Sequence, residues 1–286
     1  MICAQLLGVK KMTVLNNYGV VYTPDALANF TVKLLLSETT PDIFDFNQVA
    51  TVLDPACGQG ILLKAFSNEF SLRYSQTIHS IGIDVENAVI DNNKKRFVDN
   101  TYQFICKNTI IPSEKLTAFN YWKRQIKDLP FVIANPPWSS EKVFTKSELS
   151  QAGYELYTGQ YDSYVLFIEL CLKLTKRGGM LAFIIPDSLF SGETKKLREH
   201  LLKNTQIKVI ARLGEKLFPN VNRATSVIIL KNDIPSPDSI TKCYRLDTAD
   251  RKKFLLGSLD IFDSYIQKNT VCFKRGLRII KIMFLI

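Results

Sequence analysis

The chain has 286 residues, of which 46% are hydrophobic and 22% charged, the composition of an ordinary globular protein with a sizeable core. Its formal net charge of +10 suits a polyanionic partner. Six cysteines without a Cys-x-x-Cys pair, together with two histidines, argue against a zinc site and fit reduced thiols in the cytoplasm. The sequence has neither a secretory signal nor an apolar stretch of transmembrane length, so we expect a cytoplasmic protein with no membrane association.

The first predicted element is a helix over residues 26–36. Thr23, Pro24 and Asp25 precede it, and proline is favoured at an early helical position. Its apolar side chains recur at helical spacing and fall on one face. The pattern by itself predicts a capped helix that packs on a core.

A strand over residues 49–53 leads into the loop from Asp54 to Gly60, and a helix follows from Ile61. This order predicts the nucleotide-binding opening of a Rossmann-like unit, in which Gly58 and Gly60 let the backbone approach a ligand. The third glycine of the dinucleotide motif is missing, and no Gly-Lys-Ser/Thr of a phosphate loop occurs. An acidic residue at the strand end suits a cationic ligand better than a pyrophosphate.

The next two predicted strands end in polar side chains. Residues 78–83 form the second strand, and Asp84 at its end is placed to accept hydrogen bonds from both hydroxyls of a ribose. Residues 104–111 form the third, with Asn108 near its end. Both side chains are therefore candidates for ligand binding at the carboxyl edge of the sheet.

The fourth predicted strand, residues 131–134, runs into Asn135, Pro136, Pro137 and Trp138. The prolines end the strand because they cannot donate to a sheet ladder. The Asn135 side-chain oxygen and the Pro136 carbonyl are two acceptors that suit the two N–H groups of an exocyclic amine on an aromatic base. Trp138 offers a face for stacking and for stabilising a nearby cation. The plainer alternative is a strand-ending turn with a core tryptophan.

The rest of the chain repeats the alternation of helix and strand as far as Lys231. A polar stretch to Gly159, expected to be a mobile loop over the site, is followed by the word Tyr161-Asp162-Ser163 and an apolar helix to Lys176. Predicted strands cover residues 180–186, 207–213 and 225–230, with Phe218 between the last two. We divide the chain into a catalytic domain, residues 1–232, and a linker with an incomplete C-terminal segment, residues 233–286.

The sequence motifs described above occur in the same order in amino-methyltransferases that use S-adenosylmethionine. Tyr22-Thr23-Pro24, the loop from Asp54 to Gly60 and Asn135-Pro136-Pro137-Trp138 together resemble the γ class of DNA N6-adenine methyltransferases. That class includes type I modification subunits and fused restriction–modification enzymes. The implied fold is a doubly wound, mainly parallel α/β sheet of the class I S-adenosylmethionine-dependent methyltransferases.

The resemblance also implies roles for single residues. In such enzymes the target adenine flips out of double-stranded DNA and its amine is methylated directly, without a metal. Catalysis is assigned to Asn135, Pro136, Pro137 and Trp138, and stacking on the base to Trp138 and Phe218. The Phe218 position also fits a core phenylalanine. S-adenosylmethionine binding is assigned to Tyr22, Thr23, Pro24, Asp54, Ala56, Gly58, Gly60, Asp84 and Asn108. The family has an Asp at the Asn108 position, which holds the adenine amine of the cofactor.

Two other functions remain open at this point. The Asn-Pro-Pro-aromatic word also occurs in methyltransferases that act on a protein glutamine or an RNA base. The chain is also compatible with a truncated, inactive remnant that only binds cofactor. In the resembled enzymes a further domain or a specificity subunit reads the DNA sequence, so we expect this chain to need one of them.

Overall fold

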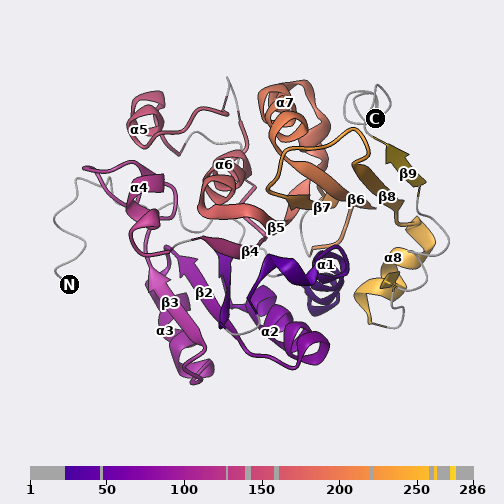
Figure 1. Cartoon of the computed structure of the whole chain (residues 1–286), viewed down its shortest axis with the longest axis horizontal. Helices are drawn as coiled ribbons and strands as arrows, with labels where there is room; N and C mark the ends of the chain where they lie inside the picture. Colours follow the sequence, from indigo (N-terminus) through magenta and orange to yellow (C-terminus); the bar gives the residue numbers. More distant parts are fainter. Residues whose placement is uncertain are drawn as a thin grey trace.

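The computed structural model describes residues 23–45, 48–126, 128–138, 143–157, 161–218, 222–257, 261–262 and 271–274. These residues build a central sheet with helices on both faces (Figure 1). The described strands follow the order β3-β2-β1-β4-β5-β7-β6-β8-β9. Their bounds are β1 Ala50–Asp54, β2 Ile78–Asp84, β3 Tyr102–Cys106, β4 Leu129–Ala134, β5 Thr175–Pro186, β6 Gln206–Gly214, β7 Thr225–Lys231, β8 Ile240–Arg245 and β9 Val271–Lys274.

The sheet is mainly parallel. β1 pairs in parallel with β2 and β4, β2 with β3, and β4 with β5, whereas β7 runs antiparallel between β5 and β6. The chain passes outward from β1 to β3 and then returns to place β4 on the other side of β1. This reversal between β1 and β4 is a topological switch point, where open α/β sheets bind ligands at the carboxyl ends of their strands. The predicted doubly wound fold is confirmed.

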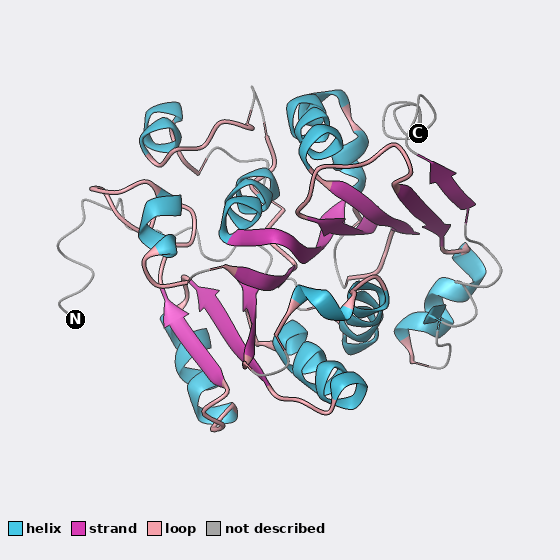
Figure 2. Cartoon of the chain, viewed as in Figure 1, coloured by secondary structure: helices cyan, strands magenta, loops and turns pink. Residues whose placement is uncertain are grey.

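Two layers of helices cover the sheet (Figure 2). Strand β4 explains why both faces are apolar, because Phe131 and Ile133 point into one core and Val132 and Ala134 into the other. The first core contains side chains of α1 Asp25–Ser37, α2 Ile61–Tyr74, α3 Asn87–Arg96 and α8 Thr248–Leu255. The second contains side chains of α4 Ala118–Lys123, α5 Lys146–Gln151, α6 Tyr164–Leu174 and α7 Lys195–Asn204. The 3₁₀ turns are η1 Pro41–Ile43, η2 Asp187–Phe190 and η3 Gly192–Thr194.

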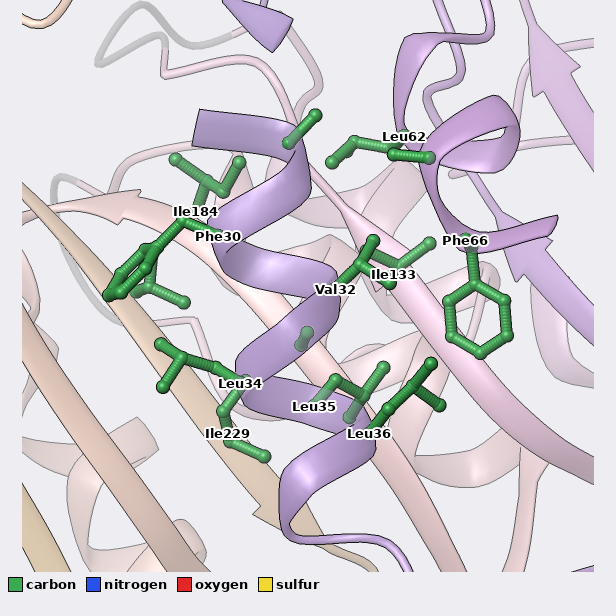
Figure 3. Close-up of a cluster of buried hydrophobic side chains, with 14 of the residues drawn as sticks. Phe30, Val32, Leu34, Leu35, Leu36, Leu62, Phe66, Ile133, Ile184 and Ile229 are labelled. Atoms are coloured by element: carbon green, nitrogen blue, oxygen red, sulfur yellow. The ribbon is translucent and has the colours of Figure 1, made fainter. Parts of the chain in front are cut away.

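Helix α1 fixes the chain that precedes it over the centre of the sheet. Its apolar side chains, Phe30, Val32 and Leu34 among them, share one core with Ile133 of β4, Ile184 of β5 and Ile229 of β7, with α2 on one side (Figure 3). The helix has buried side chains on most of its circumference, so it is held by packing rather than by a side-chain cap. The start of α1 consequently brings Thr23 and Pro24 to the carboxyl edge of the sheet.

Two predicted boundaries were wrong for local reasons. The third strand ends at Cys106 instead of residue 111, because Asn108 Oδ1 accepts hydrogen bonds from the N–H groups of Ile110 and Ile111 and turns the chain. Helix α6 ends at Leu174 rather than at Lys176, and β5 begins at once. The side-chain amide of Asn232 donates to carbonyl oxygens around this junction, which supports the early end of the helix.

The segment after Lys231 adds strands to the edge of the same sheet. β8 pairs in parallel with β6, and β9 pairs antiparallel with β8. Helix α8 packs against the end of β6, where Arg251 Nε donates to the carbonyl oxygen of Leu213. The division of the chain at residue 233 stays a prediction. No helix in the described part of the chain combines the length and the apolar character needed to cross a membrane.

Candidate functional site

The carboxyl ends of β1, β2 and β4 bring the predicted site residues to one edge of the sheet. The register pairs Asp54 with Gly82 on one side of β1 and Leu53 with Val132 on the other. The polar residues at the carboxyl ends of these strands therefore lie at the same edge of the sheet. This arrangement places the glycine loop, Asp84 and the Asn-Pro-Pro-Trp segment around the switch point.

The glycine loop adopts a conformation that requires glycine at two places. Gly58 and Gly60 have φ of +46° and +73°, in the left-handed region. A Cβ at Gly60 would touch the ring of Phe97, whereas a Cβ at Gly58 would meet no atom within 4 Å. The backbone at Gly58 thus borders open space, and the close approach of a ligand there stays a prediction.

Asp84 joins the second strand to this loop. Its Oδ2 accepts a hydrogen bond from Gly58 N at 2.9 Å, and its Oδ1 accepts one from Glu86 N at 3.0 Å. Each carboxylate oxygen has a further lone pair, so the side chain retains capacity for ligand hydroxyls. Asp84 therefore shapes the loop as well as being placed to bind a ribose, and its role toward a cofactor stays a prediction.

Asp54 is the most buried acidic side chain of the site, with 1% of its surface exposed. Burial raises its pKa from the ordinary 3.8 to about 8, the hydrogen bond from Ala56 N lowers it, and the nearby charge of Asp84 raises it. A carboxyl group of this kind is stabilised in its charged form when a cation binds beside it. The site thus has the electrostatic character that a positively charged ligand would complement.

Asn108 does not have the free oxygen that its predicted role requires. Its Oδ1 already accepts from Ile110 N at 2.9 Å and from Ile111 N at 3.0 Å, which uses both lone pairs. The adjacent Thr109, which sequence reasoning missed, donates its hydroxyl to the carbonyl oxygen of Pro55 and ties this turn to the glycine loop. Asn108 therefore shapes the turn after β3, and a contact with the cofactor through its oxygen is not supported by this geometry.

Asn135 is held in a defined orientation by the start of α1. Its Nδ2 donates to Thr23 Oγ1 at 3.1 Å, a contact between residues 112 positions apart. No described residue donates to Asn135 Oδ1 or to the Pro136 carbonyl oxygen. Among the described residues these two acceptors are therefore unoccupied, and their predicted role toward an exocyclic amine stays a prediction. Tyr22, the first residue of the Tyr-Thr-Pro word, lies outside the described residues.

Trp138 and Phe218 come together, but they contact each other directly. Their ring centroids are 5.2 Å apart and the planes are inclined by 85°. A base stacked between two parallel rings needs them about 7 Å apart, because each contact takes about 3.5 Å. Phe218 is 3% exposed and belongs to the core on the α1 side. Stacking by these two rings stays a prediction that requires at least one of them to move.

The stretch between Trp138 and α6 contains more structure than predicted. Of the expected loop, residues 143–157 are described and include helix α5, which starts with a capping box between Thr145 and Glu148. The buried carboxylate of Glu169 on α6 accepts from the backbone N–H groups of Glu155 and Leu156. Among the described residues, no cluster of three His, Cys, Asp or Glu side chains is arranged to hold a metal ion.

Solved structures support the fold. A Listeria monocytogenes protein described as a class I S-adenosylmethionine-dependent methyltransferase superposes with a TM-score of 0.62 at 21% identity, covering 82% of this chain and 71% of that one. A type I restriction-modification methyltransferase subunit from Streptococcus thermophilus gives a TM-score of 0.66 at 15% identity, covering 93% and 58%. The chain therefore has the fold of class I S-adenosylmethionine-dependent methyltransferases.

Sequence comparison assigns the chain to a narrower group of proteins than the fold does. The type II methyltransferase M.BanIII of Aneurinibacillus aneurinilyticus is 26% identical over 212 residues, which cover 70% of this chain and 36% of the relative. The chain spans between 23% and 37% of the length of the first curated relatives that it matches. The model of the Eco57I restriction-modification methylase family matches residues 16–218. The chain belongs to the Eco57I restriction-modification methylase family.

Proposed function

We propose that this chain transfers a methyl group from S-adenosylmethionine to N6 of adenine in DNA, as the catalytic part of a restriction–modification system. The family supports the methylase activity and its setting, and S-adenosylmethionine is the methyl donor of the fold class. The single observation that carries the choice of an amine is the pair of acceptors, Asn135 Oδ1 and the Pro136 carbonyl oxygen, to which none of the described residues donates. DNA and a separate specificity subunit, or a target-recognition region in a longer protein, are the proposed partners.

The residues present fit the cofactor. S-adenosylmethionine would supply an electrophilic methyl group on a positively charged sulfur. The open space at Gly58 gives its bulk a place against the backbone, Asp84 offers acceptors for hydroxyl groups, and buried Asp54 favours a cation nearby. Thr23 and Pro24 stand at the start of α1 beside Asn135. These four parts of the chain are assigned to cofactor binding on that basis.

The residues that follow the carboxyl end of β4 act on the target amine. An aromatic amine is a poor nucleophile because its lone pair is delocalised into the ring. Asn135 Oδ1 and the Pro136 carbonyl, by accepting its two N–H groups, draw the nitrogen toward a tetrahedral shape and place the lone pair outside the ring plane. Holding the amine in this orientation supplies much of the rate enhancement. The face of Trp138 supports the base and the positive charge that develops on nitrogen.

The test is transfer of tritium from labelled S-adenosylmethionine to a mixture of DNA, RNA and protein. Label in DNA alone is the expected result. Label in protein or RNA would favour the other substrates on which this motif is used. Absence of transfer to any acceptor, with cofactor binding intact, would favour an inactive remnant.

Replacing Gly58 by alanine should weaken cofactor binding beyond its effect on folding. Gly257, with φ of +68° and open space at its Cβ, is a matched control outside the site. Each alanine variant should lose about 1–2 kcal/mol of stability, because a left-handed conformation costs an L-residue that much. Calorimetry should show about tenfold or greater loss of S-adenosylmethionine affinity for Gly58→Ala alone. Equal affinity in the two variants would contradict the placement of the cofactor.

The pKa of Asp54 predicts a dependence of stability on pH. Because its folded pKa is raised to about 8 from 3.8, the folded chain binds a proton that the unfolded chain has lost between these values. The unfolding free energy should therefore decrease as pH rises through this range, with the loss complete above the folded pKa. Urea titrations at about pH 5 and about pH 9 should show this decrease in the wild type, whereas Asp54→Asn should lack most of it. A parallel pH dependence in the variant would assign the effect to other groups.

Phe218→Leu should separate stacking from core packing. Leucine keeps most of the apolar volume, so stability should fall by less than about 1.5 kcal/mol. Loss of the aromatic face should cost about 1–3 kcal/mol of affinity for an extruded base, reported by 2-aminopurine at the target position. Phe254, also 3% exposed and edge to face with Phe30, provides the matched control variant Phe254→Leu. Unchanged base binding in Phe218→Leu would leave Phe218 with a core role.

A further inference from the structure

The catalytic segment has few backbone groups by which the rest of the protein can hold it. Pro136 and Pro137 have no N–H, so neither can donate to a neighbouring strand or loop. Two side chains hold the stretch, since Asn135 Nδ2 donates to Thr23 and Trp138 Nε1 donates to the Ile184 carbonyl oxygen at 3.4 Å. The carbonyl groups of residues 136–138 are further groups through which neighbouring side chains can hold it. The groups that donate to these carbonyl oxygens decide which of the three carbonyls can still accept a hydrogen bond from a substrate.

Two of these three carbonyls are occupied by side-chain donors. Ser163 Oγ donates to the Pro137 carbonyl oxygen at 2.5 Å, and Arg223 Nη1 donates to the Trp138 carbonyl oxygen at 2.9 Å. Ser163 stands at the N-cap of α6, but its hydroxyl makes no cap hydrogen bond and reaches the proline instead. No described residue donates to the carbonyl oxygen of Pro136. Within the described part of the chain, the carbonyl without a donor is thus the one that the proposed mechanism needs.

The Arg223 guanidinium, which donates to the Trp138 carbonyl, is itself held in place by an ion pair. Arg223 Nη2 donates to Asp162 Oδ2 at 2.6 Å, and the same oxygen accepts from Ser188 Oγ at 2.6 Å. Ser188 belongs to η2, and its hydroxyl lies 3.3 Å from the hydroxyl of Tyr164 on α6. Because Asp162 is 8% exposed, the ion pair is largely shielded on the acidic side. The start of α6, η2 and the residues before β7 are joined behind the catalytic segment.

We propose that Ser163 and the Arg223–Asp162 pair are positioning residues that orient the segment for methyl transfer. They occupy the carbonyls of Pro137 and Trp138 and leave the Pro136 carbonyl and Asn135 Oδ1 as the acceptors for the target amine. This inference rests on the proposed function and adds residues to it. Their sequence positions, 26 and 85 residues from their partners, explain why the motif alone does not reveal them.

The acidic partner has an electrostatic purpose as well. The target nitrogen gains positive charge as it is methylated, and an unpaired guanidinium on the Trp138 carbonyl would oppose that charge. Asp162 neutralises Arg223 while leaving its second arm on the Trp138 carbonyl. Asp162→Asn should therefore lower the rate even though the amide preserves the shape of the side chain.

The test compares Arg223→Met and Ser163→Ala with a matched ion-pair variant. The Lys242–Glu38 pair has the same 2.6 Å separation and nearly the same exposure, 39% and 7% against 36% and 8%. It lies at the opposite end of α1 from Thr23, about 20 Å along a helix of 13 residues. Lys242→Met thus controls for the loss of a half-buried ion pair outside the site. Single-turnover methyl transfer, S-adenosylmethionine affinity and melting temperature are measured for each variant.

The position of Trp138 is followed independently of activity. The chain has two tryptophans, so 5-fluorotryptophan gives two ¹⁹F resonances, and Trp138→Phe assigns them. We expect Arg223→Met and Ser163→Ala to lower the transfer rate by about 10- to 100-fold, since small misplacements of reacting groups have effects of that size. Cofactor affinity should change less than about twofold, the Trp138 resonance should move, and Ser163→Thr should restore the rate.

Lys242→Met should alter stability alone. A transfer rate within about twofold of wild type in Arg223→Met and Ser163→Ala, with the Trp138 resonance unmoved, would overturn the inference while the proposed function stands. If the wild type transfers no methyl group to any acceptor, the proposed function fails. The ¹⁹F resonance of Trp138 then decides alone whether these residues hold the segment.

Discussion

Asn135→Ala should lower methyl transfer by about 100-fold or more while S-adenosylmethionine affinity stays near that of wild type. The variant removes one of two acceptors for the target amine, and loss of a single preorganised hydrogen-bonding group at a reacting centre has effects of this size. The affinity for the cofactor should change little, because the Asn135 side chain makes no described contact with the glycine loop or Asp84, and Thr23, which it does contact, stays fixed by the packing of α1. Single-turnover transfer and calorimetry measure the two quantities.

Asn135→Asp is the informative companion to this variant. A carboxylate keeps an oxygen acceptor, and the Thr23 hydroxyl can turn to donate to it. We therefore expect it to retain more activity than the alanine variant. Equal loss in both variants would indicate that the shape of the side chain matters rather than its acceptor. Turnover near the wild-type rate in Asn135→Ala would rule out the proposed role of this residue.

The isolated chain should bind DNA weakly, with little sequence preference and a steep dependence on salt. The net charge of +10 favours contacts with phosphates, and these carry no sequence information directly. With several such contacts, affinity should fall by about 10³-fold between about 50 and about 200 mM salt. Fluorescence anisotropy with unrelated duplexes over this range measures both properties.

Site-specific methylation should require a separate reader. The first curated relatives are much longer than this chain, which spans 23% to 37% of their length. We propose that sequence reading resides in a specificity subunit or in a region of those longer proteins. Efficient methylation of genomic DNA at one short motif by the purified chain alone, mapped by sequencing, would show this proposal to be wrong.

The order of helices and strands was predictable because each strand of the switch point ends in a distinctive residue. Asp54, Asp84 and Asn135 each follow a buried apolar run, and the two glycines mark the first loop. Edge elements were harder to predict. β8 has only two buried side chains, Thr241 and Tyr244, among its six residues, shows no regular alternation and carries no motif, so its sequence does not stand out from the linker around it. Its partner β6 lies earlier in the chain, and only folding brings the two together.

The sequence predicts which residues follow the strands at this edge of the sheet, but not the contacts that they make with one another. The Asn-Pro-Pro-Trp word indicates two acceptors and an aromatic face, whatever surrounds them. That Thr23 holds Asn135, or that Phe218 meets Trp138 edge to face, depends on side chains brought together over long stretches of sequence. Asn108 illustrates the same limit, because its local turn uses the oxygen that the motif reserves for a ligand.

The central claim is that the methyl group goes to N6 of adenine, and analysis of the methylated product tests it most directly. DNA is incubated with the chain and S-adenosylmethionine carrying a deuterated methyl group, then digested to nucleosides and analysed by mass spectrometry. The account predicts deuterated N6-methyldeoxyadenosine in the wild-type reaction and its loss with Asn135→Ala. A deuterated methyl group on cytosine, or on adenine in equal amounts with Asn135→Ala, would contradict it.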